Sequence, residues 1–191
     1  AFTFEIPMMA SAMDSAVSPT TAIEIGRLGG LAVLNLEGLW TRYADPDPVY
    51  AEIAALPPEK STQRMQELYQ EPIKPELIGQ RVQEIKDGGV MAAASLTPQN
   101  VAKYAEMAIG GGLDILVIQG TVVSAEHVSS REEPLDLNNF IVNSEVPVIV
   151  GGCASYAGAL HLMRTGAVGV LVGVGPGAAC TSRGVLGIGV P

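Results

Sequence analysis

The feature that most constrains this chain is a repeated alternation between short apolar runs and amphipathic stretches. The runs are almost continuously apolar rather than apolar at every second residue, which is typical of parallel strands buried on both faces. The six runs are Phe4–Ala10, Leu31–Leu34, Val90–Ala94, Ile115–Gln119, Val146–Val150 and Val168–Val174. This alternation predicts an α/β fold with a parallel sheet and right-handed crossover helices.

Helix starts and stops support the same interpretation. Ser18-Pro19 and Thr97-Pro98 each place a capping side chain before a proline, which is favoured at the first helical position. Pro75 is expected to open another helix, whose apolar face carries Ile78, Val82 and Ile85. Glycines then end the predicted helices, at Gly29-Gly30, Gly88-Gly89, Gly110–Gly112 and Gly166. Helix, glycine stop and strand follow one another as in a series of βα units.

Six strands fit either an open doubly wound sheet or part of a (β/α)8 TIM barrel, which needs eight strands and about 250 residues. Residues 184–191 resemble a loop that leads into further structure, and this favours the barrel. We therefore expect residues 1–191 to form one C-terminally incomplete barrel domain with about the first six βα units. A helical insertion is expected at about 36–88, with two extra short helices between Trp40 and Lys74.

Charge and composition exclude several functional classes. The 11 basic and 20 acidic residues give a net charge of −9, which argues against nucleic acid as a partner. No apolar run approaches the roughly 20 residues of a membrane span, so no membrane partner is expected. Two cysteines form no disulfide framework, and the default compartment is a reducing cytoplasm.

In parallel α/β proteins, reacting groups gather just after the carboxyl ends of the strands. The richest such segment is Gly173–Arg183, where alternate glycines are followed by Cys180, the hydroxyls of Thr181 and Ser182, and a cation at Arg183. Nearby positive charge or backbone N–H groups convert a thiol to a nucleophilic thiolate. The alternative is a glycine-rich turn that holds an inert, buried cysteine.

Other candidates are weaker. Cys153 is interpreted as a small buried residue, and His127 and His161 lack partners at metal-ligand spacing. Met8, Met9 and Met13 are interpreted mainly as core residues, although Met13 follows the first strand and could contact a flat ligand. Asp14 is the carboxylate that we find just after a strand. A phosphate-binding barrel isomerase would need an acid/base pair there, so that class is disfavoured.

The segment Gly175-Pro176-Gly177-Ala178-Ala179-Cys180-Thr181-Ser182-Arg183, followed by Gly187-Ile188-Gly189-Val190-Pro191, resembles a signature of the IMP dehydrogenase/GMP reductase family. That signature is close to G-P-G-S-x-C-T-T-R followed by G-x-G-x-P. Ser11-Ala12-Met13-Asp14 is similar to the family's S-x-M-D segment, and Gly29-Gly30 to its G-G turn. The resemblance covers essentially the whole chain. It is closest to the short, CBS-less, IMP-dehydrogenase-related proteins of bacteria.

The resemblance implies an NAD(P)-dependent oxidoreductase that acts at C2 of a purine 5′-monophosphate through a covalent Cys180 adduct, and it implies a homotetramer. Ser182 would transfer protons, with Thr181 beside it. The other implied contacts are Ser11, Met13, Gly152, Gly177 and Ala178 to the nucleotide, Gln119 and Gly120 to NAD(P)(H), and the carbonyls of Gly175, Gly177 and Cys180 to a monovalent cation such as potassium.

Four positions depart from the family pattern, and at one of them Ser182 replaces a threonine but keeps the hydroxyl. Ala178 replaces a phosphate-contacting serine, Gln119 replaces an aspartate that holds the nicotinamide riboside, and Gly151-Gly152 replaces Gly-Asn. These changes keep a noncatalytic, regulatory nucleotide-binding relative as an alternative. Between the two catalytic directions, the expected lack of CBS domains slightly favours GMP reduction to IMP over IMP oxidation to XMP.

Overall fold

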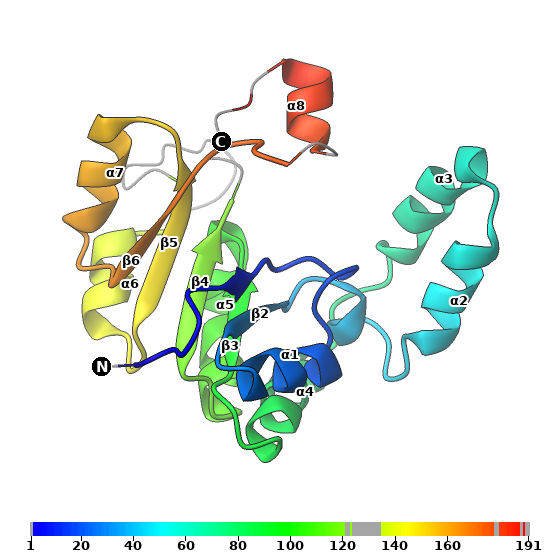
Figure 1. The fold of residues 1–191 in the computed structure, drawn as a ribbon, viewed down its shortest axis with the longest axis horizontal. Coiled ribbons are helices and arrows are strands. Elements are labelled where there is room, and N and C mark those ends of the chain that lie inside the picture. The colour runs from blue at the N-terminus through cyan, green and yellow to red at the C-terminus, as the bar shows by residue number, and fades with distance from the viewer. Residues whose placement is uncertain (1, 121–122, 124–134, 178–179, 188, 190–191) are drawn as a thin grey trace. The chain divides into compact units, whose positions relative to one another are not determined.

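The computed structural model describes residues 2–120, 123, 135–177, 180–187 and 189. The chain divides into two compact units, one of residues up to 95 with 106–113, the other of residues 96–105 with 114–191. Each unit contains three parallel strands connected through helices (Figure 1). Within the described residues no helix combines the length and the apolar character needed to cross a membrane.

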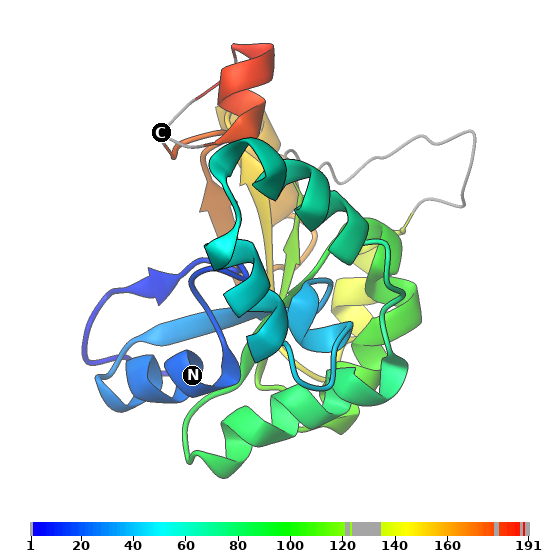
Figure 2. The same cartoon turned by 90° about the vertical axis from the view of Figure 1, so that its right-hand side faces the viewer.

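The first unit is built on β1, β2 and β3, which follow one another in space as in sequence. Its elements are β1 (Met9–Ala10), α1 (Pro19–Arg27), β2 (Leu31–Asn35), the 3-10 helix η1 (Leu39–Thr41), α2 (Asp47–Ala55), α3 (Pro58–Leu68), α4 (Pro75–Asp87) and β3 (Ala93–Leu96). Strand β1 pairs with β2 through Met9 and Leu31, and β2 pairs with β3 through Val33 and Ala93. Helices α1 and α4 lie side by side (Figures 1 and 2).

The second unit repeats this arrangement. Its elements are β4 (Ile115–Gln119), α6 (Leu137–Asn143), β5 (Val148–Cys153), α7 (Tyr156–Met163), β6 (Gly169–Val172) and α8 (Thr181–Leu186), while α5 (Pro98–Gly110) contributes residues to both units. Leu116 pairs with Val148 and Ile149 with Gly169, so the three strands are parallel. The register of β5 against β6 shifts between Gly151 and Cys153.

The helix starts predicted from proline are confirmed. Pro19, Pro75 and Pro98 are the first residues of α1, α4 and α5. The Ser18 side chain accepts a hydrogen bond from the Thr21 N–H, and the Thr21 hydroxyl accepts one from the Ser18 N–H, which completes a capping box. In α4 the predicted apolar face is buried, because Ile78, Val82 and Ile85 expose 0% of their surface.

Several strand limits differ from the prediction. The run Phe4–Ala10 contains only the two-residue strand β1, because the N–H groups of Glu5 and Ile6 both bond the Gly29 carbonyl and Pro7 has no N–H. The run Val90–Ala94 is shifted to Ala93–Leu96, since Val90 packs against α1 at Gly26. Strand β5 begins after Pro147, whereas the prediction began at Val146. Strand β6 is shorter than predicted at both ends.

The expectation that the methionines near the first strand are core residues is wrong. Met8, Met9 and Met13 expose 68%, 44% and 52% of their surface. Strand β1 has only two residues, so Met8 and Met13 lie outside it, and the first apolar run contributes little to the core.

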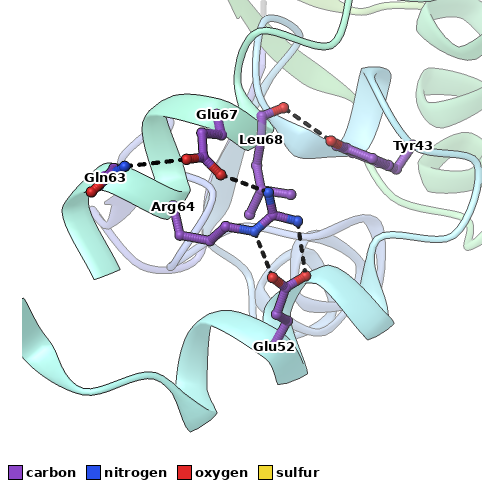
Figure 3. Close-up of polar contacts among 6 residues, drawn as sticks. All are labelled: Tyr43, Glu52, Gln63, Arg64, Glu67 and Leu68. Atoms are coloured by element: carbon purple, nitrogen blue, oxygen red, sulfur yellow. Dashed lines mark hydrogen bonds and ion pairs between the residues drawn. The ribbon is translucent and has the colours of Figure 1, made fainter. Parts of the chain in front are cut away.

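The segment between β2 and β3, residues 36–92, contains η1 and the helices α2, α3 and α4; we call it the β2–β3 segment. Helices α2 and α3 are the two extra short helices expected between residues 40 and 74. Arg64 of α3 joins them, since its Nε donates to Glu52 of α2 at 2.5 Å and its Nη1 to Glu67 at 2.8 Å (Figure 3). Leu39, Val49 and Leu68 form a small core of this segment. That the segment is an insertion in a barrel wall stays a prediction.

Gly79 of α4 and Gly111 after α5 lie in direct backbone contact. A Cβ at Gly111 would lie 2.5 Å from the Gly79 carbonyl oxygen and 2.8 Å from its Cα, so Gly111→Ala is expected to lower the free energy of unfolding by about 2 kcal/mol. Gly110→Ala is the matched control, since its Cβ would have no neighbour within 4 Å and alanine favours the helix by up to about 1 kcal/mol. Equal urea midpoints for the two variants would contradict the prediction.

Candidate functional site

In the second unit, the loop ends after β4 and β5 are bonded to each other. The Gly120 N–H donates to the Gly151 carbonyl at 2.9 Å, and the Gly152 N–H donates to the Gly120 carbonyl at 3.0 Å. Gln119, the last residue of β4, pairs with Gly151. The structure therefore brings together Gln119, Gly120 and Gly152, which were expected to contact the cofactor and the nucleotide.

The cysteine loop follows β6 in the same unit. The Gly173 N–H donates to the Cys153 carbonyl at 2.7 Å, so this loop begins beside the end of β5. Gly173 and Gly175 have φ values of 122° and 60°, which glycine adopts readily and other residues rarely do. Glycine is thus required by the path of the chain toward Cys180.

Cys180 directly precedes α8 and is half-buried. Its N–H donates to the Gly177 carbonyl at 3.2 Å, and its carbonyl accepts from the Gly184 N–H at 3.0 Å. Arg183 Nη1 lies 3.4 Å from the Pro176 carbonyl, which it contacts across the same loop. The backbone thus holds Cys180 in a compact turn. Cys153, in contrast, is buried in β5 with 3% exposure, as predicted for a small packed residue.

Part of the predicted site lies outside this description. Ala178, the expected phosphate contact, is outside the described residues, as is His127. The backbones of Thr181 and Ser182 form the first turn of α8, but their side chains are outside the described part of the chain. Their expected roles stay predictions.

The carbonyls expected to hold a cation belong to Gly175, Gly177 and Cys180. Two of these oxygens already accept a backbone hydrogen bond, which leaves each carbonyl one further lone pair. Carbonyl oxygens are hard donors that suit an alkali or alkaline-earth cation rather than a soft metal. The described residues contain no cluster of three His, Cys, Asp or Glu side chains that could hold a metal ion.

Ser11 and Met13, the other expected nucleotide contacts, are in the first unit and are both exposed. The loop that carries them is closed by backbone hydrogen bonds from Met13 N–H to the Ser11 carbonyl and from Val17 N–H to the Met13 carbonyl. Next to it lies an open cavity of about 360 Å³. Its lining includes Asp14, Trp40, Tyr50 and the hydroxyl-bearing residues Ser15, Ser18, Thr20 and Thr21.

Asp14 is the centre of a hydrogen-bond network that the sequence analysis missed. Its Oδ1 accepts from Asn35 Nδ2 at 3.1 Å, and its Oδ2 accepts from the Leu39 N–H at 2.6 Å and from the Tyr69 hydroxyl at 2.5 Å. The Tyr50 hydroxyl donates to the Asp14 carbonyl at 3.1 Å. The available signal was the position of a lone carboxylate just after a strand.

Comparison with known proteins relates this chain to one family. A sequence profile of the IMP dehydrogenase/GMP reductase domain matches residues 1–191. An uncharacterized oxidoreductase of Mycolicibacterium smegmatis is 48% identical over 197 residues, which cover 100% of this chain and 52% of that protein. The inosine-5′-monophosphate dehydrogenase of Rhodopirellula baltica is 37% identical over 87 residues, 46% of this chain and 16% of that enzyme.

A solved structure matches the same stretch. The crystal structure of an IMP dehydrogenase/GMP reductase-like protein from Corynebacterium glutamicum superposes with a TM-score of 0.90 at 43% identity, covering 98% of this chain and 50% of that one. The predicted fold class, a (β/α)8 barrel of which this chain holds six βα units, is thereby confirmed. The chain spans about half the length of the relatives it matches over its full extent.

Proposed function

The chain belongs to the IMP dehydrogenase/GMP reductase family, and from this membership we propose that the whole protein is an NAD(P)-dependent oxidoreductase acting at C2 of a purine 5′-monophosphate. The family and the oxidoreductase relatives support the class of reaction. The observation that carries the proposal is Cys180, half-buried at the start of α8 on a glycine loop that leaves the end of β6.

In this proposal the Cys180 thiolate forms a bond to C2 of the purine. A covalent adduct divides one difficult substitution into two easier steps. A nicotinamide cofactor, held at Gln119 and Gly120, would supply the hydride acceptor or donor for C2. In the oxidative direction, hydride leaves C2 and water then displaces the sulfur to give XMP and restore the thiol. In the reductive direction, the thiolate displaces ammonia from C2 of GMP with uptake of one proton, and hydride then displaces the sulfur to give IMP and restore the thiolate. Ser182 is proposed to move the proton.

The proposed binding residues divide between the two units. Gln119, Gly120 and Gly152 lie together at the ends of β4 and β5, and we assign the first two to the nicotinamide cofactor. Ser11 and Met13 are exposed and available to a nucleotide. The carbonyls of Gly175, Gly177 and Cys180 would hold a monovalent cation, whose charge would stabilise the turn of the cysteine loop. The whole protein is proposed to assemble as a homotetramer.

Of the two directions, we propose oxidation of IMP to XMP. The sequence analysis slightly preferred GMP reduction because CBS domains were not expected. That reason carries no weight, because the chain spans only about half the length of its relatives. Three relatives that align with about half of this chain, from Rhodopirellula baltica, Pasteurella multocida and Aquifex aeolicus, are called inosine-5′-monophosphate dehydrogenases, and this supports oxidation.

The test is a steady-state assay of the full-length protein with IMP plus NAD⁺ or NADP⁺ and, separately, GMP plus NADPH or NADH. We expect XMP from the first mixture and little turnover in the second. Turnover in the GMP mixture but not in the IMP mixture would reverse the assigned direction. Turnover in neither mixture, together with nucleotide binding by calorimetry, would instead identify a noncatalytic relative.

A further inference from the structure

The Asp14 carboxylate connects the loop of Ser11 and Met13 to the β2–β3 segment. Two of its three side-chain hydrogen bonds come from that segment, from the Leu39 N–H of η1 and from the Tyr69 hydroxyl just after α3. The third comes from Asn35 at the end of β2. Hydrogen bonds to a carboxylate are about twice as strong as neutral ones, so the bonds from Leu39 and Tyr69 form a strong polar link between the loop and the segment.

Two further features fit the segment to this carboxylate. The Tyr50 hydroxyl of α2 bonds the Asp14 carbonyl, so the same residue is held through its backbone as well. At Gly38 there is no room for a side chain, because a Cβ there would overlap both carboxylate oxygens of Asp14. Gly38 has an ordinary extended backbone conformation, so this glycine is explained by the space that Asp14 occupies and not by its dihedral angles.

The two tyrosines remain hydrogen-bond donors across the whole physiological range. Burial raises the pKa of Tyr69, and the hydrogen bond to Asp14 and the charge of Asp14 raise it further. Burial also raises the pKa of Tyr50, with the Asp14 charge as the next cause. A tyrosine that stays protonated cannot repel the neighbouring carboxylate.

The segment itself is braced independently of Asp14. Tyr43 donates its hydroxyl to the Leu68 carbonyl at 3.0 Å, and Arg42 donates to the carbonyls of Glu37 and Glu71 (Figure 3 shows the first contact). The Arg42 guanidinium lies 5.7 Å from the centre of the Tyr69 ring. Tyr69 is therefore presented to Asp14 by a structured support and not by a loose chain end.

We propose that Asp14 is a positioning residue, through which the β2–β3 segment holds the loop of Ser11 and Met13 in the shape that receives the nucleotide. The assignment of this loop to the nucleotide rests on the proposed function. Asp14 directly follows Met13, whose carbonyl accepts the N–H groups of Ala16 and Val17. A displacement of the carboxylate is therefore transmitted to Met13 without an intervening flexible joint.

The test compares two Tyr→Phe variants of the full-length protein. Tyr69→Phe removes the hydroxyl that bonds Asp14, whereas Tyr43→Phe removes one that bonds the Leu68 carbonyl within the segment. We expect Tyr69→Phe to raise KM for the nucleotide about five- to tenfold with kcat changed less than about twofold, and Tyr43→Phe, which removes one of several contacts that support the segment, to raise KM less than about twofold. Equal effects of the two variants would overturn the proposal.

A double-mutant cycle tests whether Tyr69 acts through Asp14. Asp14→Asn and Tyr69→Phe are each expected to raise KM, and the double variant is expected to raise it no more than the larger single change. Multiplication of the two effects would show that Tyr69 acts through another residue and would overturn the pairing. If Asp14→Asn does not fold, Gly38→Ala takes its place, since it displaces the carboxylate and leaves its chemistry intact.

A readout that needs no turnover separates this inference from the proposed function. Amide hydrogen exchange over residues 11–17 is expected to accelerate about tenfold in Tyr69→Phe and not in Tyr43→Phe. Unchanged exchange in Tyr69→Phe would refute the positioning role even in an active enzyme. Accelerated exchange in a protein that turns over neither IMP nor GMP would leave the positioning role intact and reject the proposed function.

Discussion

Cys180→Ala is expected to lower kcat of the full-length protein by a factor on the order of 10⁴ or more, because removal of a covalent nucleophile leaves no substitute for the adduct. KM for the nucleotide is expected to change little, since the Cys180 backbone bonds to Gly177 and Gly184 do not depend on its side chain. Initial rates with saturating IMP and cofactor measure the loss.

Cys153→Ala is the matched control for this variant. It removes the same atom from a residue that is buried in β5, so it is expected to lower stability slightly and to keep kcat within a few-fold of the wild type. A Cys180→Ala variant as active as the wild type would refute the covalent mechanism. Adduct formation supplies a second readout, because the Cys180 sulfur should displace chloride from 6-chloropurine ribonucleotide. The wild type, and not Cys180→Ala, is then expected to gain the mass of the reagent less HCl.

Arg81→Met is expected to cost about 2–4 kcal/mol in the free energy of unfolding, the largest stability effect that we predict. Arg81 of α4 is 5% exposed and donates to the carbonyls of Trp40, Tyr43 and Ala44 at 2.9, 3.2 and 2.5 Å. It also bonds Glu84 at 2.8 Å. The substitution leaves these acceptors without their donor, and an unsatisfied buried acceptor costs about 1–3 kcal/mol.

Arg64→Met provides the comparison for this variant, because it makes the same replacement at an exposed ion pair. The Arg64 side chain is 38% exposed, and exposed ion pairs contribute about 0–1 kcal/mol. Urea unfolding of the full-length variants measures both, provided that the slopes of the transitions agree. A larger loss for Arg64→Met than for Arg81→Met would show that burial does not determine the strength of these contacts.

Local signals predicted much of the fold. Prolines located three helix starts to the residue, and the fourth apolar run coincides with β4. The glycine stops at Gly29, Gly89, Gly112 and Gly166 all have positive φ values, as a helix end followed by a turn requires. These features depend on a few consecutive residues, and so they can be recognised from sequence.

Strand limits were less predictable, because an apolar run does not say which of its residues pair. Val90 is apolar and lies in a predicted strand, but it packs against α1 at Gly26. Val146 precedes Pro147, and its carbonyl accepts from the Ser144 hydroxyl before the strand begins. Pairing depends on the neighbouring strand, which single-segment patterns do not contain.

The candidate site likewise has one part that the sequence predicts and one part that it does not. Cys180 could be identified from a contiguous motif, and the structure places it after β6 in a closed turn. The partners of Asp14 could not be identified, because Tyr69 is 55 residues away along the chain and its hydroxyl carries no local signature. A contact of that separation follows from how the β2–β3 segment folds, and no periodicity in the sequence encodes it.

The overlap between a Gly38 side chain and the Asp14 carboxylate also limits how this chain can change over generations. A methyl group at position 38 would clash with the Asp14 carboxylate. A shorter residue at position 14 would leave the hydrogen-bond donors of Asp14 without an acceptor. A substitution at one of these two positions is therefore expected to persist only together with a substitution at the other, so the two residues should vary together.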